Sequence, residues 1–236
     1  MQTAQDVFVL VAAPGWNAQA LVSSVDLTTR AIHAYFNGRF DKKPEKAIGV
    51  YLFPEEKSYQ DYCRAKLGGT CDSPFGMYHP TLRRIVMNAG PGLGTLTHEL
   101  VHPIVESDFP RAPIGINEGI ASLFEAPVLP HTGEIHGVKN WRYAKLMSGV
   151  GAGTAKLDGL FGMNDATFRD ANEKMHYATA RYVCQWLDAR GLLWPFYRAW
   201  RDSFDADPTG AKTFERVVGT TPARANAAWT AWVKAL

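Results

Sequence analysis

The 236-residue chain has no apolar run long enough to cross a membrane, and its formal net charge is only +2. The longest apolar run, around residues 7–13, has the length of a strand and not the roughly 20 residues of a membrane helix. A charge balance so close to neutral also lacks the basic footprint of a nucleic-acid-binding protein. We therefore expect neither a membrane span nor a nucleic-acid partner.

Cysteine is also scarce, with three residues in the chain. Cys63 and Cys71 are close enough in sequence to form a disulfide around a small loop, or they remain two free thiols; their spacing matches no metal motif. Cys184 falls in the middle of a helical pattern, where we expect a buried thiol. Residues 1–6 lack the basic start and the apolar core of a signal peptide.

The apolar content of 46% and the chain length are those of one ordinary globular domain. Hydrophobic periodicity predicts strands at residues 7–11 and 48–53, helices at residues 17–37 and 55–67, and a hairpin at residues 75–89. From about residue 138 the pattern is helical to the end. We predict an α+β fold in a single domain, residues 1–236: a small mixed sheet with an edge hairpin (1–92), two central helices (93–127) and a helical subdomain (138–236).

The most informative stretch is His98-Glu99-Leu100-Val101-His102, the H-E-x-x-H arrangement of zinc peptidases. Positions four apart lie on one face of a helix, so both imidazoles can bind the same ion. Glu99 points slightly off that face, where it can reach a water molecule. The alternative is a helix whose two histidines are merely hydrogen-bonded.

The surrounding segment, residues 94–106, has apolar residues at helical spacing. Thr95 or Thr97 could cap its start. Pro103 removes one backbone donor, and we expect a kink just past the second histidine.

A third protein ligand is needed, because catalytic zinc usually takes three and leaves one position for water. Residues 116–125 predict a second helix, and Glu118 lies 16 positions after His102, enough chain to pack it against the first. We assign Glu118 as the third ligand of one zinc ion per chain, with a solvated helix-start carboxylate as the alternative. Glu125, two turns further on, could accept the free N–H of a ligand histidine or be an exposed helix residue. Asn117 is assigned the same supporting role.

These residues resemble the gluzincins, the zinc peptidases with two histidine ligands and one glutamate. The likeness lies in HELVH, in Asn117-Glu118-Gly119 and in Glu125 seven positions after the third ligand. It is closest to the small bacterial peptidase-MA-like proteins and more distant to the catalytic domains of the zinc aminopeptidases and of thermolysin. It covers roughly residues 45–235 and is looser beyond the two metal helices.

The resemblance implies a thermolysin-like zincin catalytic fold, with zinc in the cleft between the sheet part and the helical part. It also implies that Tyr177, in the helical stretch 175–183, donates to the oxyanion, with His176 as the alternative. Tyr177 could equally be an ordinary half-buried helix aromatic. Arg181, one turn later, could bind a substrate carbonyl or carboxylate, or be a helix-surface residue or a salt-bridge partner.

Substrates of this class usually bind as an added strand along a sheet edge. We expect the strand that ends at Met87, Asn88 and Ala89 to border the cleft and to bind the substrate backbone. The zinc aminopeptidases carry an acidic residue there that holds the free amine of the substrate, and this stretch has none. That departure favours an endopeptidase.

The function that these residues predict is a zinc-dependent peptidase, with a peptide or protein as substrate and Glu99 as general base toward a metal-activated water. The alternatives are a catalytically inactive peptide-binding or structural module that retains a metal, and a hydrolase of a non-peptide amide. Three evident ligands favour catalysis, because a structural zinc site is normally closed by four. The resembling proteins are often exported, so we expect a periplasmic or secreted location, with the cytoplasm as the alternative.

Overall fold

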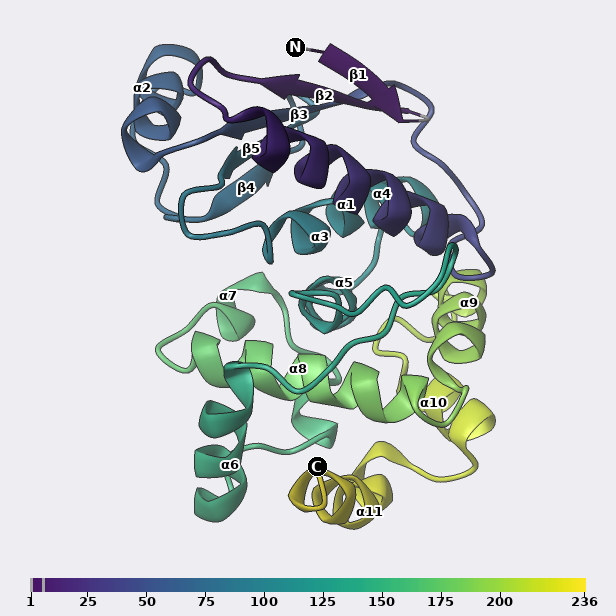
Figure 1. Cartoon of the computed structure of the whole chain (residues 1–236). Helices are drawn as coiled ribbons and strands as arrows, with labels where there is room; N and C mark the ends of the chain where they lie inside the picture. Colours follow the sequence, from purple (N-terminus) through teal and green to yellow (C-terminus); the bar gives the residue numbers. More distant parts are fainter. Residues whose placement is uncertain (1, 6) are drawn as a thin grey trace. The chain divides into compact units, whose positions relative to one another are not determined.

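The computed structural model describes the backbone of residues 2–5 and 7–236, with side chains from residue 7 onward (Figure 1). The prediction about a signal peptide concerns residues 1–6, and two of these, Met1 and Asp6, lie outside the described residues. The chain divides into two compact units: a sheet unit of residues 1–108 and 124–136, and a helical unit of residues 109–123 and 137–236. Within the described chain, every helix is too short or too polar to span a membrane. The single-domain assignment and the cleft stay predictions.

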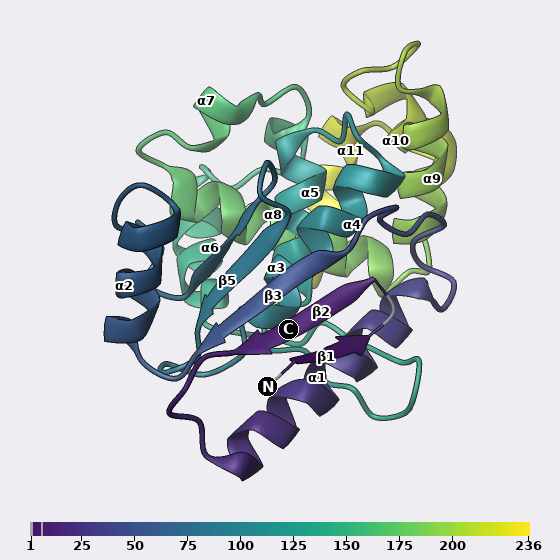
Figure 2. The ribbon, with the colours of Figure 1, turned by 90° about the horizontal axis from the view of Figure 1, so that it is seen from above.

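The sheet unit is built on five strands, β1 (Gln2–Gln5), β2 (Phe8–Ala12), β3 (Ile48–Phe53), β4 (Gly76–His79) and β5 (Arg84–Asn88). Their order is β1-β2-β3-β5-β4 (Figure 2). The three inner strands are parallel, and β1 and β4 pair with them antiparallel at the two edges. The predicted small mixed sheet with an edge hairpin is therefore confirmed, and the α+β class with it. The finer, thermolysin-like assignment stays a prediction.

Two helices pack on this sheet. In α1 (Ala18–Phe36) the side chain of Asn17 accepts the N–H of Ala20 at 2.8 Å, which fixes the start of the helix. α2 (Glu56–Lys66) packs against β3 and β5. Its Cys63 forms a disulfide with Cys71, and both lie in a buried apolar cluster that includes Val86. Of the two alternatives for this cysteine pair, the disulfide is the one that the structure contains.

The helix with the H-E-x-x-H motif is interrupted, and the position of the break corrects the expected kink. α3 (Leu96–Glu99) and α4 (Val101–Asp108) meet at Leu100, which lies before the second histidine and not after it. Pro103 explains the position, because its missing N–H and its ring act on the carbonyl four residues earlier, that of Glu99. Neither threonine caps α3: Thr95 makes no side-chain cap, and Thr97 donates to backbone carbonyls instead.

The helical unit consists of α5 (Ile114–Leu123), α6 (Arg142–Ala152), the 3₁₀ turn η1 (Asp158–Leu160), α7 (Asp165–Phe168), α8 (Glu173–Asp188), α9 (Leu193–Ser203), α10 (Ala211–Val218) and α11 (Pro222–Lys234). Trp229 anchors α11 by donating its indole N–H to the carbonyl of Tyr182 in α8, at 3.2 Å. Cys184 is buried in the same helix, and burial raises the pKa of its thiol. The expectation of a buried Cys184 is confirmed.

The helices α5 and α8 pack closely because α5 has a glycine at the contact. A Cβ atom at Gly119 would lie 2.7 Å from Sγ of Cys184 and 3.0 Å from the carbonyl oxygen of Ala180. The first distance is shorter than real Cβ contacts and the second is tight, so a side chain here would force the two helices or the Cys184 sulfur to shift. This contact positions α5, the helix that carries the predicted third ligand.

Candidate metal centre

The two histidines of the motif lie side by side. His98 is the third residue of α3 and His102 the second of α4, and their ring centroids are 4.9 Å apart. His98 is 6% exposed, and His102 is half-buried. The α3 segment is fixed by Tyr35, whose hydroxyl donates to the carbonyl of Thr97 at 2.6 Å, and by Thr97, which donates to the carbonyl of Phe124 at 2.6 Å. The motif therefore stands on a backbone that is braced by buried hydrogen bonds.

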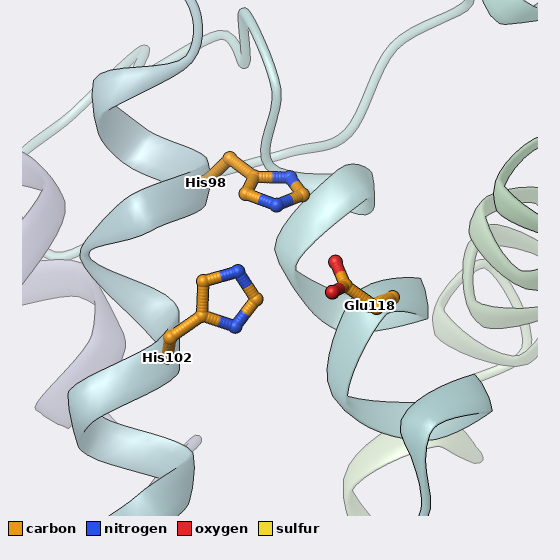
Figure 3. A group of neighbouring side chains, drawn as sticks. All are labelled: His98, His102 and Glu118. Carbon is orange, nitrogen blue, oxygen red and sulfur yellow. The ribbon is translucent and has the colours of Figure 1, made fainter. Parts of the chain in front are cut away.

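Glu118 completes a group of three candidate ligands. It lies in the middle of α5 and is 5% exposed. One ligand atom from each of His98, His102 and Glu118 can be chosen so that all lie within 4.8 Å of one another (Figure 3). Among the described residues, this is the group of histidine, cysteine or acidic side chains that could hold a metal ion. Two imidazoles and one carboxylate suit zinc and other divalent transition metals.

Glu125 lies against the first histidine, as expected, but not from a helix. The helix α5 ends at Leu123, and the chain turns through Ala126, which has a φ of 47°. This turn brings Oε1 of Glu125 to 3.3 Å from Nδ1 of His98, with Glu125 only 3% exposed. A carboxylate at Nδ1 favours the proton on that nitrogen, and the lone pair on Nε2 is then the one that can bind a metal. The supporting role of Glu125 stays a prediction, as does that of the half-buried Asn117 in α5.

Glu99, the predicted base, is the last residue of α3 and is buried. Its charge acts on the neighbouring helix α2, where burial first, and Glu99 next, raise the pKa of Tyr59 to about 12. The Tyr59 hydroxyl itself donates to the carbonyl of Ser73 at 2.9 Å. Glu99 is thus a buried carboxylate directly beside a candidate ligand, and its role as base stays a prediction.

Arg169 is a site residue that the sequence did not indicate. It follows the four-residue helix α7, which is capped by reciprocal hydrogen bonds between Asn164 and Thr167. Phe168 is fully buried against Ile114, and this anchor places Arg169 beside α5. Nη2 of Arg169 donates to Oε1 of Glu118 at 2.9 Å. No motif marks this arginine, because the four-residue helix before it is too short for a periodic signal.

Tyr177 on α8 is joined to the same arginine. Nη1 of Arg169 donates to the Tyr177 hydroxyl oxygen at 3.0 Å, and the Arg142 guanidinium lies over the Tyr177 ring at 4.9 Å. Burial raises the pKa of Tyr177, the charge of Glu118 raises it further, and Arg169 opposes both. The alternative donor, His176, instead has Nδ1 at 2.8 Å from the carbonyl oxygen of Phe168. Tyr177 therefore shares a partner with Glu118.

Arg181 corrects one predicted substrate contact. Its side chain is fully buried in the helical unit and donates to the carbonyls of Ser122 and Val138. Ser122 lies in the last turn of α5, where carbonyls lack helical partners. Arg181 thus satisfies the end of α5, and a substrate cannot reach its guanidinium. The one-turn spacing from Tyr177 suggested a shared exposed face, but α5 covers this part of α8.

Met87, Asn88 and Ala89 correct a second prediction. They were expected to bind substrate along a sheet edge, but β5 lies between β3 and β4. The N–H of Asn88 donates to Phe75 and that of Ala89 to Phe53, each at 2.8 Å, so this backbone is already paired. The edge strand of the described sheet on this side is β4, which also contacts α3.

The argument against aminopeptidase action rested on the missing acidic residue in β5, and it now has to be applied to β4, the strand at the edge. On the edge strand β4, the Tyr78 hydroxyl donates to Oε2 of Glu106 at 2.6 Å. A carboxylate therefore lies beside the edge strand after all, supplied by α4 and not by the strand itself.

No protein-family model matches the chain, and no curated protein matches it either. Function is therefore inferred from the residues and contacts of the site.

Proposed function

We propose that this protein is a zinc-dependent peptidase. The observation that carries the proposal is the group formed by His98, His102 and Glu118, with the buried Glu99 beside the first histidine. A three-ligand donor set of this kind leaves a coordination position open for catalysis. The carboxylate of Glu125 at His98 adds the partner that metal-binding histidines usually have.

Each of the remaining residues has a chemical task in this proposal. When bound, the zinc ion supplies Lewis acidity that activates water and polarises the substrate carbonyl. Glu99 accepts a proton from the attacking water and passes it to the leaving amine. Tyr177 donates a hydrogen bond to the carbonyl oxygen as negative charge develops there.

The substrate is an extended peptide that adds to the outer side of β4. An edge strand offers unpaired backbone groups at regular spacing, which bind a peptide of almost any sequence. Because β4 contacts α3, a peptide on this edge would pass near the helix that carries His98 and Glu99. This placement of the substrate replaces the one on β5.

The test combines metal content with cleavage. Wild type, Glu99→Gln and the control Glu215→Gln, an exposed glutamate on α10, are purified without chelators, analysed for zinc and assayed on unfolded casein. We expect about one zinc per chain in all three, because Glu99 is not a ligand. Glu99→Gln should lower kcat by about 10²- to 10⁴-fold, the usual contribution of a general base.

Other outcomes separate the competing functions. Zinc in all three proteins without any cleavage, on casein and on a library of short peptides, would favour a binding module that retains a metal. Absence of zinc from all three would overturn the ligand assignment itself.

A further inference from the structure

One guanidinium, that of Arg169, contacts both the predicted third ligand and the predicted oxyanion donor. Its two terminal nitrogens are divided between them: Nη2 donates to Glu118 and Nη1 to Tyr177. A third, longer contact of 3.3 Å joins Nη1 to Glu173 on α8. All four residues belong to the helical unit, so this arrangement is set within one compact part of the chain.

The burial of the partners shows where the arginine is needed. The Glu118 side chain is 6% exposed and that of Arg169 is 48% exposed. A carboxylate buried to this degree needs charged or hydrogen-bonded partners, whereas a half-exposed arginine is already well solvated. The contact therefore stabilises the charge of the buried Glu118 more than it stabilises that of Arg169.

The shape of the guanidinium explains how one side chain can hold two oxygens. Its donors form a rigid planar fork, so the position of the Glu118 oxygen and that of the Tyr177 hydroxyl are fixed relative to each other. Glu118 is one of the three side chains whose ligand atoms lie within 4.8 Å of one another, so the position that the arginine gives its carboxylate bears directly on metal binding. Tyr177 also interacts with Glu118 directly, through a side-chain hydrogen bond, so the hydroxyl and the carboxylate are joined to each other as well as to the arginine.

We propose that Arg169 is a positioning residue that orients Glu118 for metal binding and holds the Tyr177 hydroxyl in a fixed place beside it. The first part needs only a metal site, and the second rests on the proposed peptidase function. If Arg169 instead competed with the metal for Glu118, removal of its guanidinium would tighten zinc binding rather than weaken it.

The experiment measures zinc affinity by competition with a chromophoric chelator, which needs no catalysis. The variants are Arg169→Met, which keeps length but no donors, and Arg169→Lys, with Glu215→Gln as a control at an exposed glutamate on α10. We expect Arg169→Met to weaken zinc binding by about 10- to 100-fold, as loss of a partner of a metal ligand commonly does. Arg169→Lys should recover most of this loss, and Glu215→Gln should bind as wild type does.

A second measurement tests the contact with Tyr177. A lysine offers one nitrogen and cannot hold both oxygens as the fork does. With saturating zinc, Arg169→Lys should therefore lower kcat with little change in KM, as Tyr177→Phe should. The double variant should be no slower than Tyr177→Phe alone, because both changes remove the same interaction.

The results that overturn the proposal are distinct from those that overturn the peptidase. Zinc affinity of Arg169→Met equal to or tighter than that of wild type would refute the orienting role, whatever the cleavage assay gives. Additive losses in the double variant would refute the link to Tyr177. Failure of wild type to cleave any peptide would refute the peptidase and leave the metal-affinity result standing. Thermal unfolding of each variant checks folding, and Arg169→Lys keeps the test valid if Arg169→Met is unstable.

Discussion

In the sheet unit, His98 lies against the buried carboxylate of Glu125; in the helical unit, Glu118 is held by the half-exposed guanidinium of Arg169. Each of these two candidate ligands thus has a partner whose charge complements its own chemistry. An imidazole needs an acceptor that keeps one nitrogen protonated, and a carboxylate needs a donor that keeps it ionised and oriented. The two partners differ in burial, however: Glu125 is buried and Arg169 is half-exposed. Burial decides how much free energy of unfolding is lost when each contact is removed.

The largest effect should come from removing the ligands and comparing the partners left behind. Without His98, Glu125 loses this contact while it stays 3% exposed, and loss of a hydrogen-bond partner by a buried charged group costs about 3 kcal/mol. Without Glu118, Arg169 keeps its contacts with Tyr177 and Glu173 and its access to water, so we expect about 1–3 kcal/mol.

Urea unfolding of His98→Ala and Glu118→Ala, both with a chelator present, measures the difference. A Glu118→Ala variant that is less stable than His98→Ala would contradict the comparison, because Arg169 would then depend on Glu118 more than its exposure implies.

Reduction of the disulfide should be the next largest effect and should fall on the sheet unit. Cys63 and Cys71 are 8 positions apart, and closing a loop of that size stabilises by about 2.5 kcal/mol in the chain-entropy account. The helical unit has only the buried thiol of Cys184, so reductant should leave it unchanged. Hydrogen exchange with and without dithiothreitol should show faster exchange in α2 and β5 but not in α8. Equal changes in both units would mean that they unfold together.

The partner of His98 can be tested against a surface pair of the same chemistry. His136 and Glu134 lie 2.6 Å apart but are both exposed, so they offer a matched control. Glu125→Gln should weaken zinc binding by about 10-fold or more, whereas Glu134→Gln should leave it unchanged. Chelator competition measures both. An unchanged zinc affinity in Glu125→Gln would show that the buried contact stabilises the fold and does not affect how strongly His98 binds zinc.

The smallest effect concerns a carboxylate of the helical unit that lies away from the metal group. Burial alone would raise the pKa of Asp207, but hydrogen bonds from Thr213, Thr209 and Gly210 outweigh it and hold the pKa below its usual value. A lowered pKa stabilises the fold above the unfolded-state pKa of about 3.9, and this contribution is lost as pH falls through the folded-state value. Asp207→Asn should cost about 1 kcal/mol at pH 7 and less at pH 3. A cost that is the same at both values would contradict the assignment.

The sequence could predict the parts of the site that depend on local periodicity. His98 and His102 share a helix face, and Glu118 lies in an apolar segment that had to form a second helix. The predicted ends of β3 and of the β4–β5 hairpin were close to those observed, because alternation and turn residues mark them. Glu125 was placed near a ligand correctly, although the turn after α5 and not the helix brings it there.

The remaining parts depend on contacts between distant segments. Which strand of a hairpin is the edge is set by its pairing with β3, and the alternation of residues in β5 is the same for either order. Arg181 has the spacing of a surface residue, and only the packing of α5 on α8 buries it. Arg169 lies after a four-residue helix whose position depends on the burial of Phe168, and no periodic signal extends over so short an element.

Gly119 has a consequence for how such a site could be altered. The separation of the helix that carries Glu118 from the helix that carries Tyr177 is set by a missing methyl group at one position and by the sulfur of Cys184 opposite it. The distance between the two helices can therefore be changed in small steps, either by a larger residue at position 119 or by a smaller one at position 184. Engineering of the candidate metal centre would therefore begin at two residues that are not among its three candidate ligands.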